Sequence, residues 1–391
     1  MLHLVLMPRG GLFLKDGRGW YTSDVGRSYG HAWPLPPTVG GAIRAAYGRV
    51  RVEAKKEPDW SALARDLTIA RPLALRRPLG ADQFTVDHRL WPTPGDAFYD
   101  ADGRVTPLVP VKDPCLAGLD LGQEDEDGAF AALWRPRLPH DGKPGMRPVF
   151  WCESEILEWL GSAPAKGSRV IPGCNPPRRT DIHVTIDPDS QTAEPAMLFS
   201  CDVTEPLGRA SESDTSIREW GLAVACKLPG DEHADQLAAG PILLGGRRRM
   251  ATSEKVSADL FEAPAQLVQA AQGRRGLRLL CVAPALFQRG WLPDGFERQG
   301  NEYIGNLPSI PGDVILRAAI VPRPLHLSTW NMLKREPRPT LRLVAPGSVY
   351  FFEKPNGVFS AAECKSLWLA AWGGEQENGL GTVIPGRWDV P

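Results

Sequence analysis

The sequence predicts an α+β protein made of two tandem ferredoxin-like (RRM-like) units, with a large loop-rich insertion in the first unit. Three observations lead to this prediction. The 391 residues include 40 glycines and 38 prolines, near 20% against about 12% in average proteins, and these are the poorest helix formers. Short segments with β-type alternation occur in both halves of the chain. In each half the segments read as strand–helix–strand–strand–helix–strand, the order of a ferredoxin-like fold.

The first unit begins with an apolar segment, 2–6, that fits a buried strand, and apolar character resumes at 12–14. A polar loop follows and leads into a proline-rich entry to a helix. Thr38 is suited to cap this helix, and the apolar residues between 39 and 47 recur at helical spacing. We expect the helix to stop at Gly48.

The region from about 55 to 180 has the weakest pattern in the chain, because proline recurs every few residues. One short helix is predicted within it, over 154–160. A structureless stretch of this length is uncommon in a compact protein. We therefore interpret the region as an insertion of loops and short elements rather than a separate domain.

Regular alternation returns at residues 181–187, which predict a strand with Ile182, Val184 and Ile186 facing inward. After a turn, residues 196–203 predict a second strand, and the two should form an antiparallel hairpin. Further along, the pattern predicts three more features: a strand over 220–228, a short helix over 231–239 and a glycine–arginine corner over 241–250.

The second unit is predicted to start near residue 271, so that the units span 1–270 and 271–391. Its strand-like segments and its helix have clear boundaries: 277–287, 314–320, 341–352 with an internal turn, and the helix 361–372. A glycine-rich loop starting at Gly373 leads into a last strand.

The charge balance is even, with 45 basic and 46 acidic residues, but 34 of the basic residues are arginine. Arginine suits bidentate contacts with phosphate, so a local basic groove is compatible with the neutral total. The seven cysteines are scattered without a CxxC pair, and we predict no metal and no cofactor. Neither a signal peptide nor a membrane segment is expected; the prediction is a soluble, cytoplasmic protein with no membrane partner.

The strongest RNA-contact candidate is the corner formed by Gly245, Gly246, Arg247, Arg248 and Arg249. Glycines allow the backbone to approach a phosphate, and neighbouring N–H groups can form an anion-binding nest. A solvated surface turn is the alternative.

Weaker candidates are Arg178 and Arg179, just before the 181–187 strand, and Arg44, near the expected start of the first helix. An anion is favoured at a helix N-terminus, although an ordinary exposed arginine is the alternative for Arg44. Arg18 lies in a loop with Trp20 and Tyr21, the mixture that stacks unpaired bases. The glycine-rich loop at 378–381 could equally contact RNA or only pack helix against sheet.

Several segments, taken together and in order, resemble the third subunit of the Cmr (type III-B CRISPR) effector complex, within the RAMP superfamily. These segments are 13–18, 36–44, 182–187, 192–193, 198–199, 244–248, 346–352 and 379–382. The region 55–180 matches little. The resemblance implies a non-catalytic subunit that holds the 5′ repeat-derived handle of the guide RNA. The implied protein partners are the large polymerase-like subunit and the backbone RAMP subunits.

Two rival functions remain open from the sequence. RAMP relatives that process guide RNA use a histidine on the 2′-hydroxyl, so His31 could be the general base of an endoribonuclease. No second histidine or lysine is close to it in the sequence. The third option is a tryptophan-rich carbohydrate-binding protein, although no convincing carboxylate pair supports it.

Overall fold

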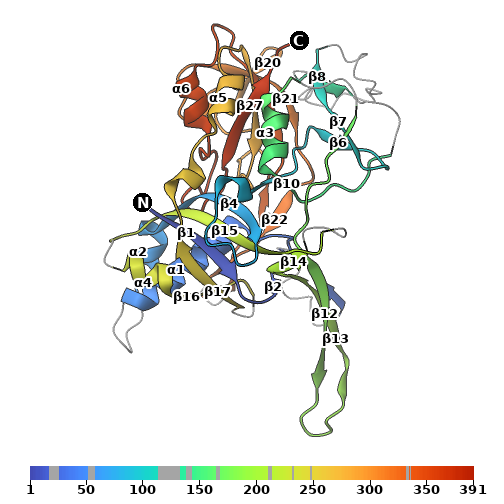
Figure 1. The fold of residues 1–391 in the computed structure, drawn as a ribbon, viewed down its shortest axis with the longest axis vertical. Helices are drawn as coiled ribbons and strands as arrows, with labels where there is room; N and C mark the ends of the chain where they lie inside the picture. Colours follow the sequence, from blue (N-terminus) through green and yellow to red (C-terminus); the bar gives the residue numbers. More distant parts are fainter. Residues whose placement is uncertain are drawn as a thin grey trace.

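The computed structural model describes the chain except for residues 17–25, 52–57, 113–132, 138–142, 164–167, 210–213, 231–232, 247–248, 332–333 and 335. It confirms the α+β class, since its sheets are mainly antiparallel and its helices are short. Two large sheets lie one above the other along the long axis, and a long hairpin extends away from the body (Figure 1).

The first large sheet has the order β10-β5-β4-β15-β1-β17-β16, and β14 pairs with β15. Its strands are β1 Leu2–Pro8, β4 Thr68–Pro78, β5 Arg89–Pro92, β10 Phe150–Cys152, β14 Leu207–Arg209, β15 Ile217–Lys227, β16 Pro241–Leu244 and β17 Arg249–Lys255. All neighbours along the path β4-β15-β1-β17 are antiparallel. Along the chain, α1 (Pro36–Arg51) lies between β1 and β4, and α4 (Ala234–Ala239) lies between β15 and β17.

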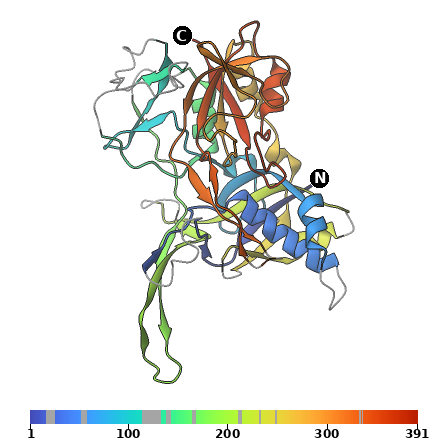
Figure 2. The same ribbon diagram turned by 180° about the vertical axis from the view of Figure 1, so that it is seen from behind.

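Helix α1 starts two residues before the expected cap Thr38 and continues past Gly48 to Arg51. Gly48 is therefore not a stop signal. A Cβ at this position would lie 2.8 Å from a methyl carbon of Leu63 in α2 (Trp60–Asp66), so the glycine permits close approach of the two helices. Figure 2 shows α1 lying across one face of the first sheet.

Strand β4 is the clearest error of the sequence prediction, which expected only loops and short elements between 55 and 180. It spans eleven residues and pairs with β15 in the middle of the sheet. Arg71 and Pro72 stand opposite the single residue Val224 at a register shift, and Arg71 has φ 52°. A bulge of this kind frees the proline from donating to the neighbouring strand. The sequence analysis missed this strand because proline is rare in central strands.

The second large sheet has the order β19-β20-β21-β26-β18-β27. Its strands are β18 Gly276–Cys281, β19 Glu297–Gln299, β20 Glu302–Gly305, β21 Val314–Ile320, β26 Val349–Glu353 and β27 Val383–Trp388. Helix α6 (Ala361–Leu367) precedes β27 and is shorter than the predicted 361–372. The predicted order also requires a helix between β18 and β21, but the fully described segment between them holds only loops and the β19/β20 hairpin. Glycine and proline recur there every few residues, which disfavours a helix.

The remaining strands form small sheets around these two. A three-stranded sheet contains β6 Ala97–Tyr99, β7 Arg104–Pro107 and β11 Arg169–Val170. Strand β8 Val109–Val111 pairs with β9 Arg135–Arg137, and β22 Leu325–Leu327 pairs with β25 Leu341–Leu343. Strand β23 Trp330–Asn331 pairs with β24 Glu336–Pro337. Helix α3 (Glu153–Gly161) contains the predicted 154–160 segment, and α5 (Ala265–Ala271) packs against both α3 and β27. In the described part of the chain, short 3₁₀ helices span Val86–His88 and Ala258–Phe261.

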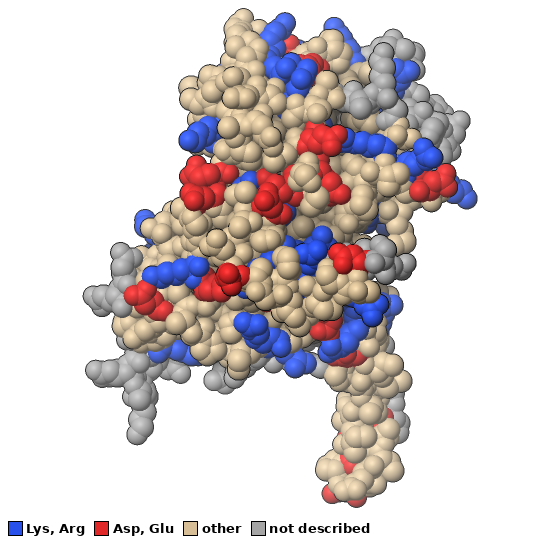
Figure 3. Space-filling view, viewed as in Figure 1, with Lys and Arg blue, Asp and Glu red and all other residues tan. Residues whose placement is uncertain are grey.

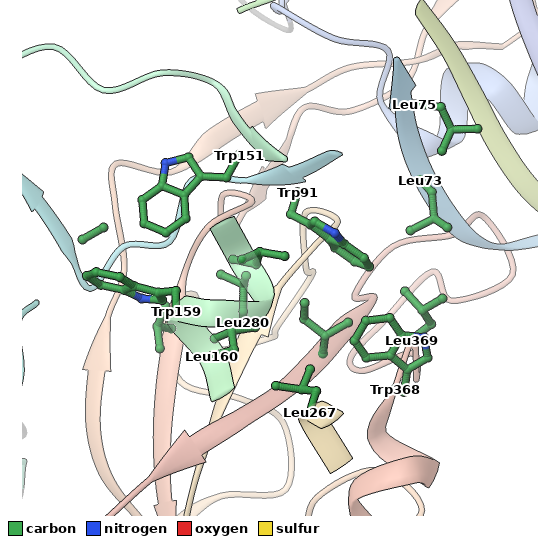
Figure 4. Close-up of a cluster of buried hydrophobic side chains, with 14 of the residues drawn as sticks. Leu73, Leu75, Trp91, Trp151, Trp159, Leu160, Leu267, Leu280, Trp368 and Leu369 are labelled. Atoms are coloured by element: carbon green, nitrogen blue, oxygen red, sulfur yellow. The ribbon is translucent and has the colours of Figure 1, made fainter. Parts of the chain in front are cut away.

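One hydrophobic cluster joins the two large sheets (Figure 4). Leu73 and Leu75 come from β4 of the first sheet, and Leu280 comes from β18 of the second. Between them lie three fully or almost fully buried tryptophans from the supposed loop insertion: Trp91, Trp151 and Trp159. The insertion therefore fills the core between the sheets. The division into 1–270 and 271–391 remains a prediction.

A buried ion pair ties the insertion to the second sheet. Asp96 Oδ2 accepts a hydrogen bond from Arg278 Nη1 of β18 at 2.6 Å, and the two side chains are 1% and 4% exposed. Asp96 Oδ1 also accepts a hydrogen bond from the indole N–H of Trp159 at 2.9 Å. Both carboxylate oxygens are thus occupied, as a buried charge requires.

The projecting hairpin consists of β12 (Arg178–Ile186) and β13 (Ala193–Thr204), as predicted for an antiparallel pair. The predicted inward orientation of its apolar residues is wrong. Ile182 is 73% exposed, and Val184 and Ile186 are also exposed. The alternation is genuine, but it marks one face of an arm that no described part of the chain covers.

Candidate nucleic-acid interface

The glycine–arginine corner connects β16 to β17 and is fixed against β2 (Leu12–Phe13) at the root of the hairpin. Gly245 has φ +72°, a conformation that glycine adopts without steric cost. The Gly246 N–H donates to the Phe13 carbonyl at 3.0 Å. This N–H is therefore not available for a phosphate, which corrects the predicted anion nest at that residue. Arg247 and Arg248 lie outside the described residues, as does Arg18.

Arg178 and Arg179 are the first two residues of β12, and carboxylates hold both side chains. Arg178 Nη2 donates to the Gly30 carbonyl at 3.1 Å and lies 3.4 Å from Asp202. Arg179 Nε donates to Asp181 at 2.6 Å, and Nη1 pairs with Glu205. The two arginine side chains remain 39% and 49% exposed, so an additional anion can still reach them.

Arg27 joins the same cluster, although no sequence signal pointed to it. It lies in β3 (Gly26–Ser28), which pairs with β13, and its Nη2 lies 2.9 Å from Asp202. Its guanidinium also stands 5.2 Å from the ring centre of Tyr29. A short strand within a polar loop has no distinctive pattern, so Arg27 could not be selected from the sequence.

Arg249 is the first residue of β17, three residues after Gly246, which forms a β-bridge with Phe13. The pKa of Asp181 lies below its ordinary value, first because the carboxylate accepts a hydrogen bond from Arg179. The charges of His183 and Arg249 make smaller contributions in the same direction. We call the group Arg27, Arg178, Arg179, Gly245, Gly246 and Arg249 the hairpin base. Figure 3 shows basic and acidic side chains interleaved where the hairpin leaves the body.

The ion pairs of the hairpin base leave some arginine N–H donors without a described acceptor. Among the described residues, Arg178 makes its polar contacts through Nη2 alone. A guanidinium carries five N–H donors, so Nε and Nη1 keep donors for another acceptor. The carboxylates orient the arginines and also reduce the local positive charge.

Arg44 lies elsewhere, and its predicted role is not supported by its position. It is in the third turn of α1, since the helix starts at Pro36, so it is remote from the free N–H groups of the helix N-terminus. Its Nε donates to the Leu67 carbonyl at 3.0 Å and its Nη2 to the Glu377 carbonyl at 3.4 Å. Burial is the main cause of its lowered pKa. Arg44 therefore ties α1 to the C-terminal glycine-rich loop.

The glycine-rich loop itself is packed tightly. Gly379 and Gly381 have φ +78° and +74°. A Cβ on Gly381 would lie 1.8 Å from the Trp372 carbonyl oxygen, and one on Gly379 would lie 3.0 Å from Cβ of Pro36. The loop also accepts a backbone hydrogen bond from Ile69 of β4 at Glu377. These contacts favour the packing alternative over direct RNA contact.

His31 lines an apolar cavity of about 360 Å³ between the two sheets, together with Trp33 and Phe150. Its backbone N–H donates to the Leu14 carbonyl at 2.7 Å. Among the described residues lining this cavity, only His31 and Arg147 have titratable side chains. An arginine is a poor proton-transfer partner because of its high pKa, so the described lining of the cavity offers His31 no second acid or base for the endoribonuclease alternative.

The family model of the CRISPR-associated protein Cmr3 matches residues 4–388, nearly the whole chain. The chain belongs to the Cmr3 family. This membership confirms the resemblance seen in the sequence and makes the chain a Cmr-type CRISPR subunit. No curated protein matches the sequence.

Solved structures with distant similarity include subunits of type III complexes. A chain of the type III-B Cmr-beta complex bound to cognate target RNA and AMPPnP is 12% identical, with a TM-score of 0.45; the match covers 89% of this chain and 86% of that one. A chain of the Csm1–Csm4 cassette in complex with pppApA is 11% identical, with a TM-score of 0.31; the match covers 89% and 85%. Among the described residues, no helix combines the length and apolar character that crossing a bilayer requires.

Proposed function

We propose that this Cmr3-family chain is a non-catalytic subunit of a cytoplasmic type III-B effector complex and binds the 5′ repeat-derived handle of the guide RNA. Family membership gives the type of complex. The observation that supports RNA binding is the hairpin base, where half-exposed arginines from separate segments of the chain meet. Such clusters bind phosphates through charge-assisted hydrogen bonds.

The strand order of the two large sheets supports the two ferredoxin-like units that the resemblance implies. Strands β4-β15-β1-β17 and β21-β26-β18-β27 follow the same relative order along the chain. This repetition supports two ferredoxin-like units, the second with a hairpin in place of its first helix. We assign the apolar face of the projecting hairpin to contacts with neighbours in the complex, which are the large polymerase-like subunit and the backbone RAMP subunits.

The hairpin offers a continuous apolar strip for such contacts. Ile182, Val184 and Ile186 alternate along β12 and share one face, and Leu198 of β13 stands directly opposite Val184. All four are exposed. Exposed apolar residues grouped in this way are typical of interaction surfaces.

The test is binding of a labelled handle RNA to the full chain at several salt concentrations. We compare the wild type with Arg27→Ala/Arg178→Ala and with the control Arg104→Ala/Arg298→Ala, whose arginines are exposed but lie outside the hairpin base. Each lost phosphate contact should reduce the slope of log K against log salt by about 0.7 for a single strand. Only the hairpin-base variant should show this reduction.

Three results would contradict the proposal. Handle binding that stays flat between low and moderate salt would show that phosphates are not held. A metal-free cleavage product of repeat RNA that disappears in His31→Ala would favour the endoribonuclease. Failure of the chain to co-purify with any RNA, when produced together with its partner subunits, would revive the carbohydrate-binding alternative.

A further inference from the structure

We propose that a groove beside the second large sheet binds single-stranded RNA. This inference rests on the proposed function and adds a second RNA contact to the one at the hairpin base. The groove has a volume of about 560 Å³. Its defining side chains are four arginines and two tryptophans: Arg135, Arg289, Arg323, Arg342, Trp134 and Trp291. We call it the arginine–tryptophan groove.

Charge distinguishes this groove from the hairpin base. None of the described residues that line it is acidic. Arg289 pairs with Glu297 at 2.6 Å, whereas within the described chain Arg135, Arg323 and Arg342 have no acidic partner. The hairpin-base arginines face carboxylates, whereas no acidic side chain of the described residues neutralises these three. An anionic chain would therefore gain more electrostatic energy in this groove.

The groove is assembled from four separate segments, and the fold holds its side chains outward. Arg342 is the central residue of β25, where Leu341 and Leu343 pair with Leu327 and Leu325 of β22 and pack in a core cluster. Because side chains alternate along a strand, Arg342 projects to the opposite, exposed face.

The backbone along the groove is also suited to close contact. Gly290 has φ +71°, and the space beside it is open, so a ligand can approach the main chain there. Three prolines in the lining, Pro136, Pro322 and Pro324, fix the local backbone. A site that is rigid before binding loses less conformational entropy when it binds.

The two tryptophans are held by neighbours while remaining partly exposed. The Arg317 guanidinium lies 5.2 Å from the ring centre of Trp134, and Trp388 contacts the same ring at 6.0 Å. Tyr303 packs edge-on against Trp291 at 5.8 Å. Fixed aromatic rings beside arginines that have no acidic partner in the described part of the chain are the combination that stacks unpaired bases and tracks their phosphates.

Single-stranded RNA fits these features better than an acidic polypeptide or a duplex. An acidic peptide would use the arginines but would not require two aromatic faces. In a duplex the bases are already stacked and cannot reach the tryptophans. The concave shape and its volume suit unpaired nucleotides.

The test measures the affinity of the full chain for a short fluorescent oligouridine and for a duplex of equal length. The groove variant is Arg323→Glu/Arg342→Glu, and the control with the same charge change is Arg104→Glu/Arg298→Glu. The groove variant should bind the single strand at least about tenfold more weakly, with a salt slope lower by about 1.4 for two lost phosphates. The control should match the wild type, and crosslinks from 4-thiouridine RNA should map to peptides containing Trp134 or Trp291.

The hairpin-base variant Arg27→Ala/Arg178→Ala is measured in parallel with handle RNA. If the groove variant keeps the affinity and salt slope of the wild type, the groove proposal is wrong, while handle binding at the hairpin base can still hold. If only the groove variant loses RNA, the hairpin base is wrong and the groove is supported. A groove variant that binds RNA normally but fails to assemble with partner subunits would identify a protein-docking surface and overturn the proposal.

Discussion

Replacing Asp96 with alanine should destabilise the whole chain, because Asp96 neutralises Arg278 between the insertion and the second sheet. The two side chains are 1% and 4% exposed, so little water can reach the arginine that is left. Breaking a buried pair by removing one partner costs about 3–5 kcal/mol. The indole N–H of Trp159 also loses its acceptor, which by itself costs about 1–3 kcal/mol. Because the groups share one network, the costs do not add.

We therefore expect Asp96→Ala to lower the free energy of unfolding by about 3–5 kcal/mol, measured by urea titration with tryptophan fluorescence. The double variant Asp96→Leu/Arg278→Met removes both charges and retains apolar volume. It should be more stable than Asp96→Ala, since an apolar replacement of a buried pair is often neutral.

A loss below about 1 kcal/mol for Asp96→Ala would refute this reasoning, because losses that small are typical of exposed pairs. A double variant that is less stable than the single variant would also refute it. Such a result would mean that the cost comes from lost packing rather than from the uncompensated arginine.

Three other measurements test separate features. Gly381→Ala should lower the free energy of unfolding, measured by urea titration, by well over about 2 kcal/mol, because its Cβ would meet the Trp372 carbonyl. The control Gly103→Ala, with φ +75° and open space, should lower it by only about 1–2 kcal/mol. Equal losses for the two variants would contradict the clash. Ile182→Thr should change stability by less than about 0.5 kcal/mol because Ile182 is 73% exposed, and a loss above about 2 kcal/mol would show that it is buried. Among the described cysteines, Cys152 should react fastest with a thiol reagent at neutral pH, since the others are buried; rapid labelling of Cys281, whose pKa burial raises to about 12, would be inconsistent with this core.

Strands can be predicted from this sequence where the pattern of apolar residues is clear, and they are missed where proline interrupts the segment. The strand 314–320 was predicted with the correct ends because six of its seven residues are apolar, Arg317 being the exception, and no proline lies within it. Strand β4 was missed because Pro72 normally excludes a central strand, and only the bulge at Arg71 makes the proline tolerable. The exposed face of β12 could not be foreseen, since alternation shows that one face is apolar but not whether anything covers it.

The candidate site was predictable only in part. Arg178, Arg179 and Arg249 stood out as charges beside strand ends, and the fold brings them to the hairpin base. For Arg44 the RNA contact remains a prediction, since the structure shows its side chain donating to the Leu67 and Glu377 carbonyls in the third turn of α1. Arg27 and the arginine–tryptophan groove depend on contacts between segments far apart in the chain, for which a single sequence contains no local signal.

The three tryptophans between the sheets also determine how far this chain could be shortened. Because Trp91, Trp151 and Trp159 come from the proline-rich region that the sequence predicted to be an insertion of loops and short elements, deleting that region would expose apolar faces on both sheets. A protein engineer seeking a minimal version should therefore trim the projecting arm rather than the insertion. The same logic predicts that natural length variation is tolerated at the tip of the arm and penalised around these rings.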